Sequence, residues 1–170
     1  MNSNELFLNF LTRRGVLTSS RRDEVQKVLA QQKDSNIVEI LVRGGFVNSE
    51  DLARQEAEFF NLEYTRLNKR IPDEVLSMVP FELARDSGAI CFDINVRYLK
   101  VALVYPSTEN LDKLRAWAKE KNMQVDYSIC NLVDYEKSLA CYLIKNESLK
   151  QTEITATKQA SLKNHYDWST

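Results

Sequence analysis

The sequence has few of the residues that build metal sites, disulfide frameworks or histidine-based catalysis. Its 170 residues include one histidine, His165, and three cysteines in no CxxC pattern. An odd number of widely spaced cysteines with a single imidazole argues against a zinc site and against a disulfide framework. Cys91, Cys130 and Cys141 are therefore interpreted as buried, reduced thiols.

Long apolar runs and a strong net charge are also missing. No apolar stretch approaches the roughly 20 residues that span a bilayer, and residues 1–14 lack the apolar core of a signal peptide. The formal net charge of −1 gives no general reason to expect polyanion binding. These absences predict a cytoplasmic chain with no nucleic-acid partner and no direct insertion into a membrane.

Signals for catalysis are absent as well. The sequence contains no Gly-x-x-x-x-Gly-Lys-Ser/Thr loop, so we do not expect it to cradle the phosphates of ATP. His165 lies in a polar C-terminal stretch, which argues against a histidine-based triad. The acidic residues are dispersed, and nothing points to lysine, cysteine or carboxylate catalysis. We expect no catalytic residue, no bound metal and no enzymatic activity.

What the sequence does contain is an internal repeat near its N-terminus. The segment from Leu11 to Ser19 aligns with the segment from Leu41 to Ser49, and this offset fits one helix-turn-helix unit per copy. Gly15 and Gly45 occupy matching places where a helix would end in a left-handed residue, a conformation that a side chain disfavours. The repeat predicts two helical hairpins that pack on each other. A chance pairing of two amphipathic hairpins is the alternative.

The residues after each glycine predict how the hairpins close. Val16 and Phe46 are expected to contact Leu11 and Leu41, respectively, which is the apolar contact of a Schellman ending. The predicted N-caps of the next helices lie three residues after each glycine: Thr18 and Asn48.

After Asn61 the pattern changes to short strands and helices. Helices are expected to begin near Pro72 and Pro80 and after the caps Thr108 and Asn131. Strands are expected at residues 89–93, 98–105 and 125–130, and the apolar run at 99–104 should be central.

The predicted fold class is α+β, with an N-terminal four-helix pair of repeated hairpins packed on a small α/β sandwich of about three or four strands. The predicted boundaries are 1–60 for the hairpins, 61–144 for the sandwich and 145–170 for a flexible linker or tail, since this last stretch is polar and lacks periodicity. Tyr166 and Trp168 within it could instead anchor a partner.

Five further segments follow the hairpins in a recognisable order. They are Phe60–Tyr64, Ile71–Val75, Val79–Arg85, Val101–Pro106 and Leu111–Leu114. Over residues 8–143 this order resembles the N-terminal domain of type II secretion and type IV pilus assembly ATPases. The resemblance implies a regulatory domain of a hexameric motor, with an ATPase domain attached after the linker or associated with it. It also implies docking onto a cytoplasmic part of an inner-membrane assembly-platform protein, and hence a peripheral place at that membrane.

Part of this family binds cyclic-di-GMP through the repeated hairpin, where each copy begins with an arginine-leucine-glycine triplet. Here the matching positions hold Leu6-Phe7-Leu8 and Asn36-Ile37-Val38. The missing arginines remove cationic partners for phosphate, and the missing glycines remove close backbone approach. Nucleotide binding stays an alternative, with cyclic-di-GMP as its ligand. The residues assigned to it are Arg13, Arg14, Gly15, Val16, Leu41, Arg43, Gly45, Phe46 and Leu52.

Arginines gather beside the predicted turns: Arg13, Arg14, Arg21, Arg22 and Arg43. They could grip phosphates or an acidic partner surface, because helix N-termini nearby also favour anions. The preferred interpretation is that these arginines are solvent-exposed and that Asp23, Glu24 and Glu50 balance their charge. A free-standing adaptor that borrowed the fold is a third reading of the whole chain.

Overall fold

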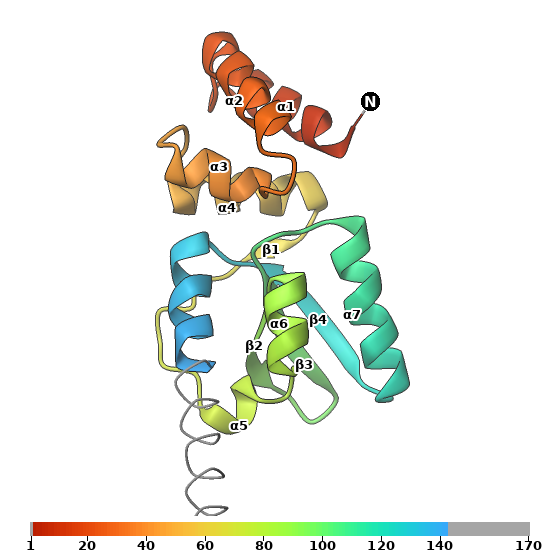
Figure 1. Cartoon of the computed structure of the whole chain (residues 1–170). Helices are drawn as coiled ribbons and strands as arrows, with labels where there is room; N and C mark the ends of the chain where they lie inside the picture. The colour runs from red at the N-terminus through yellow and green to blue at the C-terminus, as the bar shows by residue number, and fades with distance from the viewer. Residues whose placement is uncertain (1, 143–170) are drawn as a thin grey trace, which may run out of the picture.

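The computed structural model describes residues 2–142, and the predicted tail at 145–170 lies outside them. Figure 1 shows a helical layer above a sheet that is covered by further helices. The helices are α1 (Ser3–Arg13), α2 (Ser19–Gln31), α3 (Ile37–Arg43), α4 (Ser49–Phe60), α5 (Asp73–Leu76), α6 (Phe81–Ser87), α7 (Thr108–Glu120) and an unlabelled helix over residues 132–142. The strands are β1 (Glu63–Tyr64), β2 (Ala89–Ile94), β3 (Tyr98–Leu103) and β4 (Gln124–Ile129).

The first glycine turn ends α1 in the predicted Schellman geometry. Gly15 has a φ of +73°. The Val16 N–H donates to the Leu11 carbonyl at 3.0 Å, and the Gly15 N–H donates to the Thr12 carbonyl at 3.1 Å. These two bonds satisfy carbonyls that the end of a helix otherwise leaves unpaired.

The second glycine turn ends α3 in the same way. Gly45 has a φ of +72°. The Phe46 N–H donates to the Leu41 carbonyl at 3.0 Å, and the Gly45 N–H donates to the Val42 carbonyl at 3.1 Å. The two copies therefore share one backbone conformation and one hydrogen-bond pattern, as the repeat predicts.

Side-chain caps begin the helices that follow the turns. Thr18 accepts from the Arg21 N–H at 3.3 Å, and Asn48 accepts from the Glu50 N–H at 2.9 Å. Asn131 caps the last helix, since its side-chain oxygen accepts from the Asp134 N–H at 2.8 Å. These three caps were expected.

One predicted cap was wrong by one residue. Ser107, not Thr108, caps α7, because its hydroxyl accepts from the Asn110 N–H at 3.1 Å. Thr108 is the first residue inside the helix.

The four strands form a mixed sheet in the order β1-β4-β3-β2. β3 pairs antiparallel with β2 and parallel with β4, so the most apolar strand is an inner one. Its residues Val101, Ala102 and Leu103 are fully buried. The sheet confirms the α+β class and the expected number of strands.

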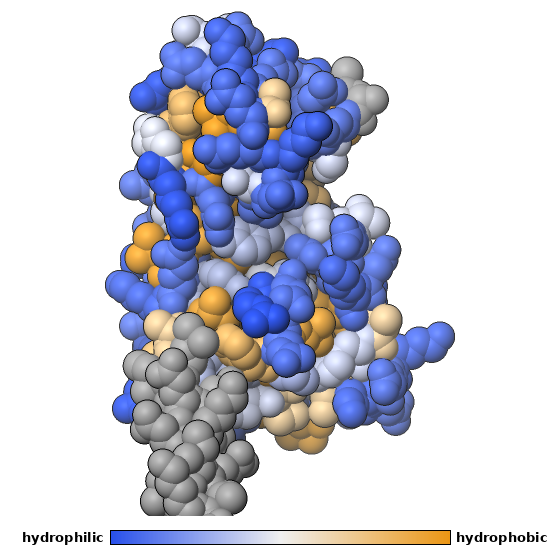
Figure 2. Space-filling model, in the orientation of Figure 1, coloured by the Kyte–Doolittle hydropathy of each residue, from blue (hydrophilic) through white to orange (hydrophobic). Residues whose placement is uncertain are grey.

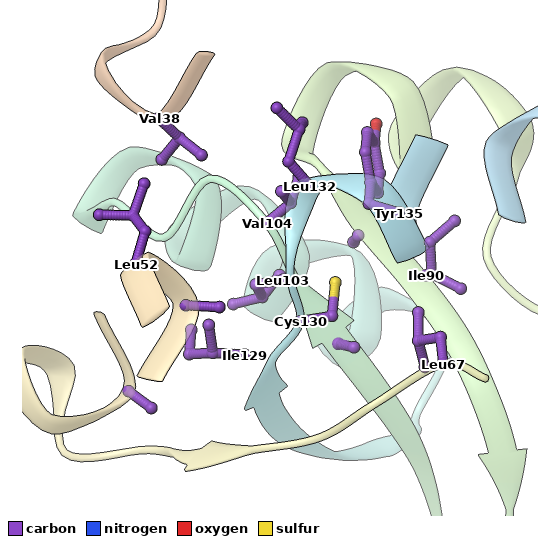
Figure 3. Close-up of a cluster of buried hydrophobic side chains, with 14 of the residues drawn as sticks. Val38, Leu52, Leu67, Ile90, Leu103, Val104, Ile129, Cys130, Leu132 and Tyr135 are labelled. Atoms are coloured by element: carbon purple, nitrogen blue, oxygen red, sulfur yellow. The ribbon is translucent and has the colours of Figure 1, made fainter. Parts of the chain in front are cut away.

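The hairpin of α3 and α4 lies between the other two parts of the chain (Figure 1). On one side, α2 packs on α3 and α1 packs on α4; on the other, α4 packs on β1 and β4. Figure 3 shows the buried side chains of Val38 and Leu52 from this hairpin in one cluster with Leu103 and Ile129 of the sheet. One apolar core therefore runs through both layers.

The cysteine interpretation was only partly right. Cys91 and Cys130 are free and buried, and Cys141 is free and exposed. Burial raises the pKa of Cys91 to about 11, and it also raises the pKa of Cys130. These two buried thiols are therefore protonated at neutral pH and behave as small apolar side chains.

Candidate functional site

The glycines of the two turns leave open space around them. A Cβ built on Gly15 or on Gly45 would meet no atom within 4 Å. Their positive φ angles, rather than close contact with a neighbour, are therefore what the turns require of these residues.

A groove of about 350 Å³ lies between the two turns and the start of α4. Val16 and Phe46, both among the candidate nucleotide-binding residues, line it together with Arg54. The exposed carboxylate of Asp51 lines the same groove. A phosphate placed there would meet a like charge, which weakens the case for an anionic ligand.

Two arginines near the turns, Arg14 and Arg21, have partners within the protein. Arg14 forms an ion pair with Glu58, and its guanidinium lies 5.3 Å from the centre of the Phe10 ring. Arg21 donates to the Phe46 carbonyl at 3.2 Å.

The guanidinium of Arg43 contacts the last helix, in the sheet layer. It forms an ion pair with Glu136 and lies 4.0 Å from Glu39. The hydrogen bond that Arg43 donates to Glu136 raises the pKa of Arg43, and the nearby negative charge of Glu39 adds to the shift. Arg14, Arg21 and Arg43 are thus engaged at separate places on the surface and do not converge on one phosphate.

The other candidate residues lie either in the core or at the surface. Leu41 and Leu52 are fully buried in the core. Arg13 is exposed at the end of α1.

At residues 6–8 and 36–38, where the arginine-leucine-glycine triplets would lie, this chain carries larger or uncharged side chains. Leu8 is 1% exposed and Val38 is 4% exposed, so each occupies space that a glycine would leave to a ligand. Leu6 is largely exposed. Asn36 caps α3 by accepting from the Val38 N–H at 2.8 Å. No side chain at these positions offers a positive charge.

The joint between the α3–α4 hairpin and the sheet layer also contains polar contacts, which no sequence pattern indicated. The Tyr105 hydroxyl donates to the Glu39 carboxylate at 2.7 Å. Burial is the main cause that raises the pKa of Tyr105, and the bond to Glu39 acts in the same direction. Together with the ion pair between Arg43 and Glu136, this bond ties α3 to the loop after β3 and to the last helix.

A second polar group lies beneath α4. Asp134 is buried, and its carboxylate accepts from the Leu67 N–H at 2.9 Å and from the Asn131 side chain at 3.1 Å. The same Asn131 amide donates to the Tyr64 hydroxyl at 3.1 Å. The Arg54 guanidinium of α4 covers the Tyr64 ring at 4.6 Å. These contacts connect α4, β1 and the last helix.

Glu56 is a buried carboxyl on the face of α4 that meets the sheet. Its exposed fraction is 2%, and burial raises its pKa well above the ordinary value. Its negative charge would lie close enough to Cys130 to raise the pKa of that thiol. Sequence periodicity alone does not reveal such a residue, because a glutamate in an amphipathic helix is normally expected on the solvent side.

In the part of the chain that the structure describes, no helix has both the length and the apolar character needed to cross a bilayer. Within the same residues, no group of three histidine, cysteine or acidic side chains is placed to hold a metal ion.

Comparisons with known proteins found likeness at the level of structure. No family model and no curated protein sequence matches the chain. A structure of the N-terminal domain of XpsE is similar, with a TM-score of 0.62 and 13% identity over 82% of this chain and 96% of that chain. A structure of MshE with cdg is also similar, with a TM-score of 0.59 and 16% identity over 80% of this chain and 97% of that chain. The fold expected from the resemblance to the N-terminal domains of secretion and pilus ATPases is thereby confirmed.

Proposed function

We propose that this chain is a non-catalytic docking domain of a type II secretion or type IV pilus assembly ATPase. In this role it contacts a cytoplasmic part of an inner-membrane assembly-platform protein and relays the state of that protein to the motor. The observation that carries the proposal is the shared fold, which spans 96% of the XpsE N-terminal domain.

The arrangement of the layers supports a relay. The α3–α4 hairpin contacts both the first hairpin and the sheet. It is held to the sheet layer by side-chain pairs, among them Tyr105 with Glu39 and Arg43 with Glu136. Polar joints of this kind can break and re-form at modest cost, so a partner that binds one layer can shift the placement of the other.

The test is direct reconstitution. The purified chain is mixed with the cytoplasmic region of the assembly-platform protein encoded in the same genome, and the mixture is measured by size-exclusion chromatography with light scattering. We expect a discrete complex at micromolar concentrations. Two separate peaks with the masses of the free components would contradict docking.

A second candidate function is sensing of cyclic-di-GMP, because the similar MshE structure was solved with cdg. The side chains of Leu8 and Val38 weigh against it in this chain. Titration calorimetry of the purified chain with cyclic-di-GMP tests this second function. Saturable heat that is lost in Arg13→Ala or Arg43→Ala would make ligand sensing the better assignment, and the absence of heat would remove it.

A further inference from the structure

Strand β4 has an outer edge that is only partly paired within residues 2–142. β1 pairs with β4 only at Ser128 and Ile129. On its other side, β4 pairs with β3 along its whole length, from Gln124 to Ile129. The outer edge over residues 124–127 therefore lacks a neighbouring strand in the described part of the chain, and an unpaired edge is a template for another strand.

The register shows which backbone groups face this open edge. The Ile129 carbonyl accepts from the Thr65 N–H at 2.8 Å, so the backbone of Ile129 faces outward. Backbone groups alternate between the two edges of a strand, and the pairing of β4 with β3 is regular. Val125 and Tyr127 therefore present their N–H and C=O groups on the open edge.

A groove of about 780 Å³ lies between the C-terminal part of α7 and β4, and it includes Gln124, Val125 and Tyr127 of the partly unpaired stretch of the strand. The half-buried side chains of Val125 and Tyr127 form part of its wall. Three cationic side chains line it: Arg97, Arg115 and Lys119. Of the described residues, no acidic side chain lines this groove. The nearest ion partner of Arg115 is Asp112, at 3.7 Å.

The positive charge reaches the apolar part of the groove. Burial raises the pKa of Tyr127, and the positive charge of Arg115 opposes that shift. The groove therefore combines a partly apolar wall with three cations, of which Arg115 is paired with Asp112. This combination suits acidic side chains on an extended backbone.

Exposed apolar surface lies at one end of the groove. Ile94 is 42% exposed and Val96 is 101% exposed, both at the turn between β2 and β3 and close in sequence to the groove residue Arg97. Figure 2 shows an apolar patch at the lower end of the molecule, where Figure 1 places this turn. Side chains exposed in this way favour contact with a protein partner.

We propose that an extended, acidic segment of a partner protein adds as a strand to the outer edge of β4 and directs acidic side chains into the groove lined by Arg97, Arg115 and Lys119. This inference rests on the proposed docking function and names the surface and the chemistry of the partner. Main-chain hydrogen bonds to Val125 and Tyr127 supply affinity, and the alternate side chains supply specificity. A nucleic acid or a lipid headgroup would meet the cations but would leave the open backbone groups unpaired.

The experiment titrates the full 170-residue chain, labelled with nitrogen-15, with a short capped peptide that alternates valine and glutamate. We expect saturable shifts of the amide signals of Val125 and Tyr127. A matched peptide with lysine in place of glutamate is expected to bind at least about 10-fold more weakly, because it places like charges in the groove. Equal binding of the two peptides, or shifts confined to other regions, would overturn the proposal.

Two variants test the edge and the groove separately. Val125→Pro removes an outward N–H and leaves the ladder to β3 intact, so it should weaken peptide binding by at least about 10-fold. The double variant Arg115→Glu with Lys119→Glu changes only exposed side chains and should weaken binding by a similar factor, which keeps the proposal testable if the proline variant does not fold. Lys27→Glu with Lys33→Glu, an equal change of charge at exposed residues of the helical layer, should leave binding unchanged.

Competing ligands and the platform protein give further outcomes. If inorganic tripolyphosphate or vesicles with anionic lipids produce the shifts and the acidic peptide produces none, the groove is an anion site of another kind and the proposal fails. If folded Val125→Pro still binds the assembly-platform protein, docking uses another surface; the strand-addition inference then fails while the proposed function stands. If the platform protein binds neither the unchanged chain nor Val125→Pro, the proposed function fails. The peptide titration then remains the only test of strand addition to β4.

Discussion

The hydroxyl of Tyr105, in the loop after β3, donates a hydrogen bond to the carboxylate of Glu39 in α3 at 2.7 Å. The two residues are 66 positions apart in the sequence, and their contact closes the joint between the helical hairpins and the sheet. A long-range polar contact of this kind favours one orientation of the two layers over others.

Removal of this bond should loosen the joint. Tyr105→Phe keeps the ring and deletes the hydroxyl, so we expect the free energy of unfolding in urea to fall by about 0.5–1.5 kcal/mol. The matched control is Tyr98→Phe, at a half-buried tyrosine for which the structure shows no side-chain hydrogen bond. Equal effects of the two substitutions would mean that the bond to Glu39 adds nothing to stability.

Substitution of either turn glycine by alanine should cost about the same. Gly15→Ala and Gly45→Ala place a side chain in the left-handed region without any clash, because the space around both is open. The expected loss is about 1–2 kcal/mol in each case, measured by chemical denaturation. Gly15→Asn and Gly45→Asn serve as controls and should cost less, since asparagine tolerates this conformation. A large loss at one turn and none at the other would show that the turns are not equivalent.

The stability of the protein should fall with rising pH because of Glu56. Burial raises the pKa of this carboxyl in the folded state, so the folded protein holds a proton that the unfolded chain releases above the ordinary value of 4.5. Its contribution is fully present below that value and is lost as the pH rises toward the folded pKa. Glu56→Gln should remove this part of the slope and should be more stable by about 1–3 kcal/mol at pH 8.

The control for this pH series is Glu63→Gln, at an exposed carboxyl in β1. It should leave the dependence on pH close to that of the unchanged protein. If Glu56→Gln retains the full slope in urea denaturation between pH 5 and pH 8, ionisation of Glu56 is not its source.

Loss of the Asp134 carboxylate should be costly. Asp134→Ala leaves the Leu67 N–H and the Asn131 amide without their buried acceptor. The expected loss of stability is about 2–3 kcal/mol, measured by thermal and chemical unfolding. Asp126→Ala, at an exposed aspartate on β4, is the matched control and should change stability by less than about 0.5 kcal/mol. A small effect at Asp134 would indicate that water replaces the acceptor.

Several features could be predicted from the sequence because they depend only on neighbouring residues. The ends of α1 and α3 follow from Gly15 and Gly45, since both Schellman bonds of each turn lie within six consecutive residues. The apolar run of β3 likewise predicted its inner place in the sheet, because a strand buried on both faces needs apolar side chains on both.

The candidate nucleotide-binding residues could not be assigned reliably from the sequence. Its apolar members, such as Leu41 and Leu52, match the family pattern because they build the core. Arginines that are close in sequence, such as Arg14 and Arg21, meet different partners in the folded chain. Proximity in sequence therefore did not indicate a common site.

By itself, the sequence determined the repeated hairpins, their glycine turns and the positions of the later strands along the chain. These depend on local backbone preferences and on the spacing of apolar side chains, which act over a few residues. Only the tertiary structure decided the burial of Glu56, the bond between Tyr105 and Glu39, and the open edge of β4 beside its cationic groove. Each of these arises when segments distant in the chain meet, and side-chain pairing across such distances depends on the register and packing of the whole fold.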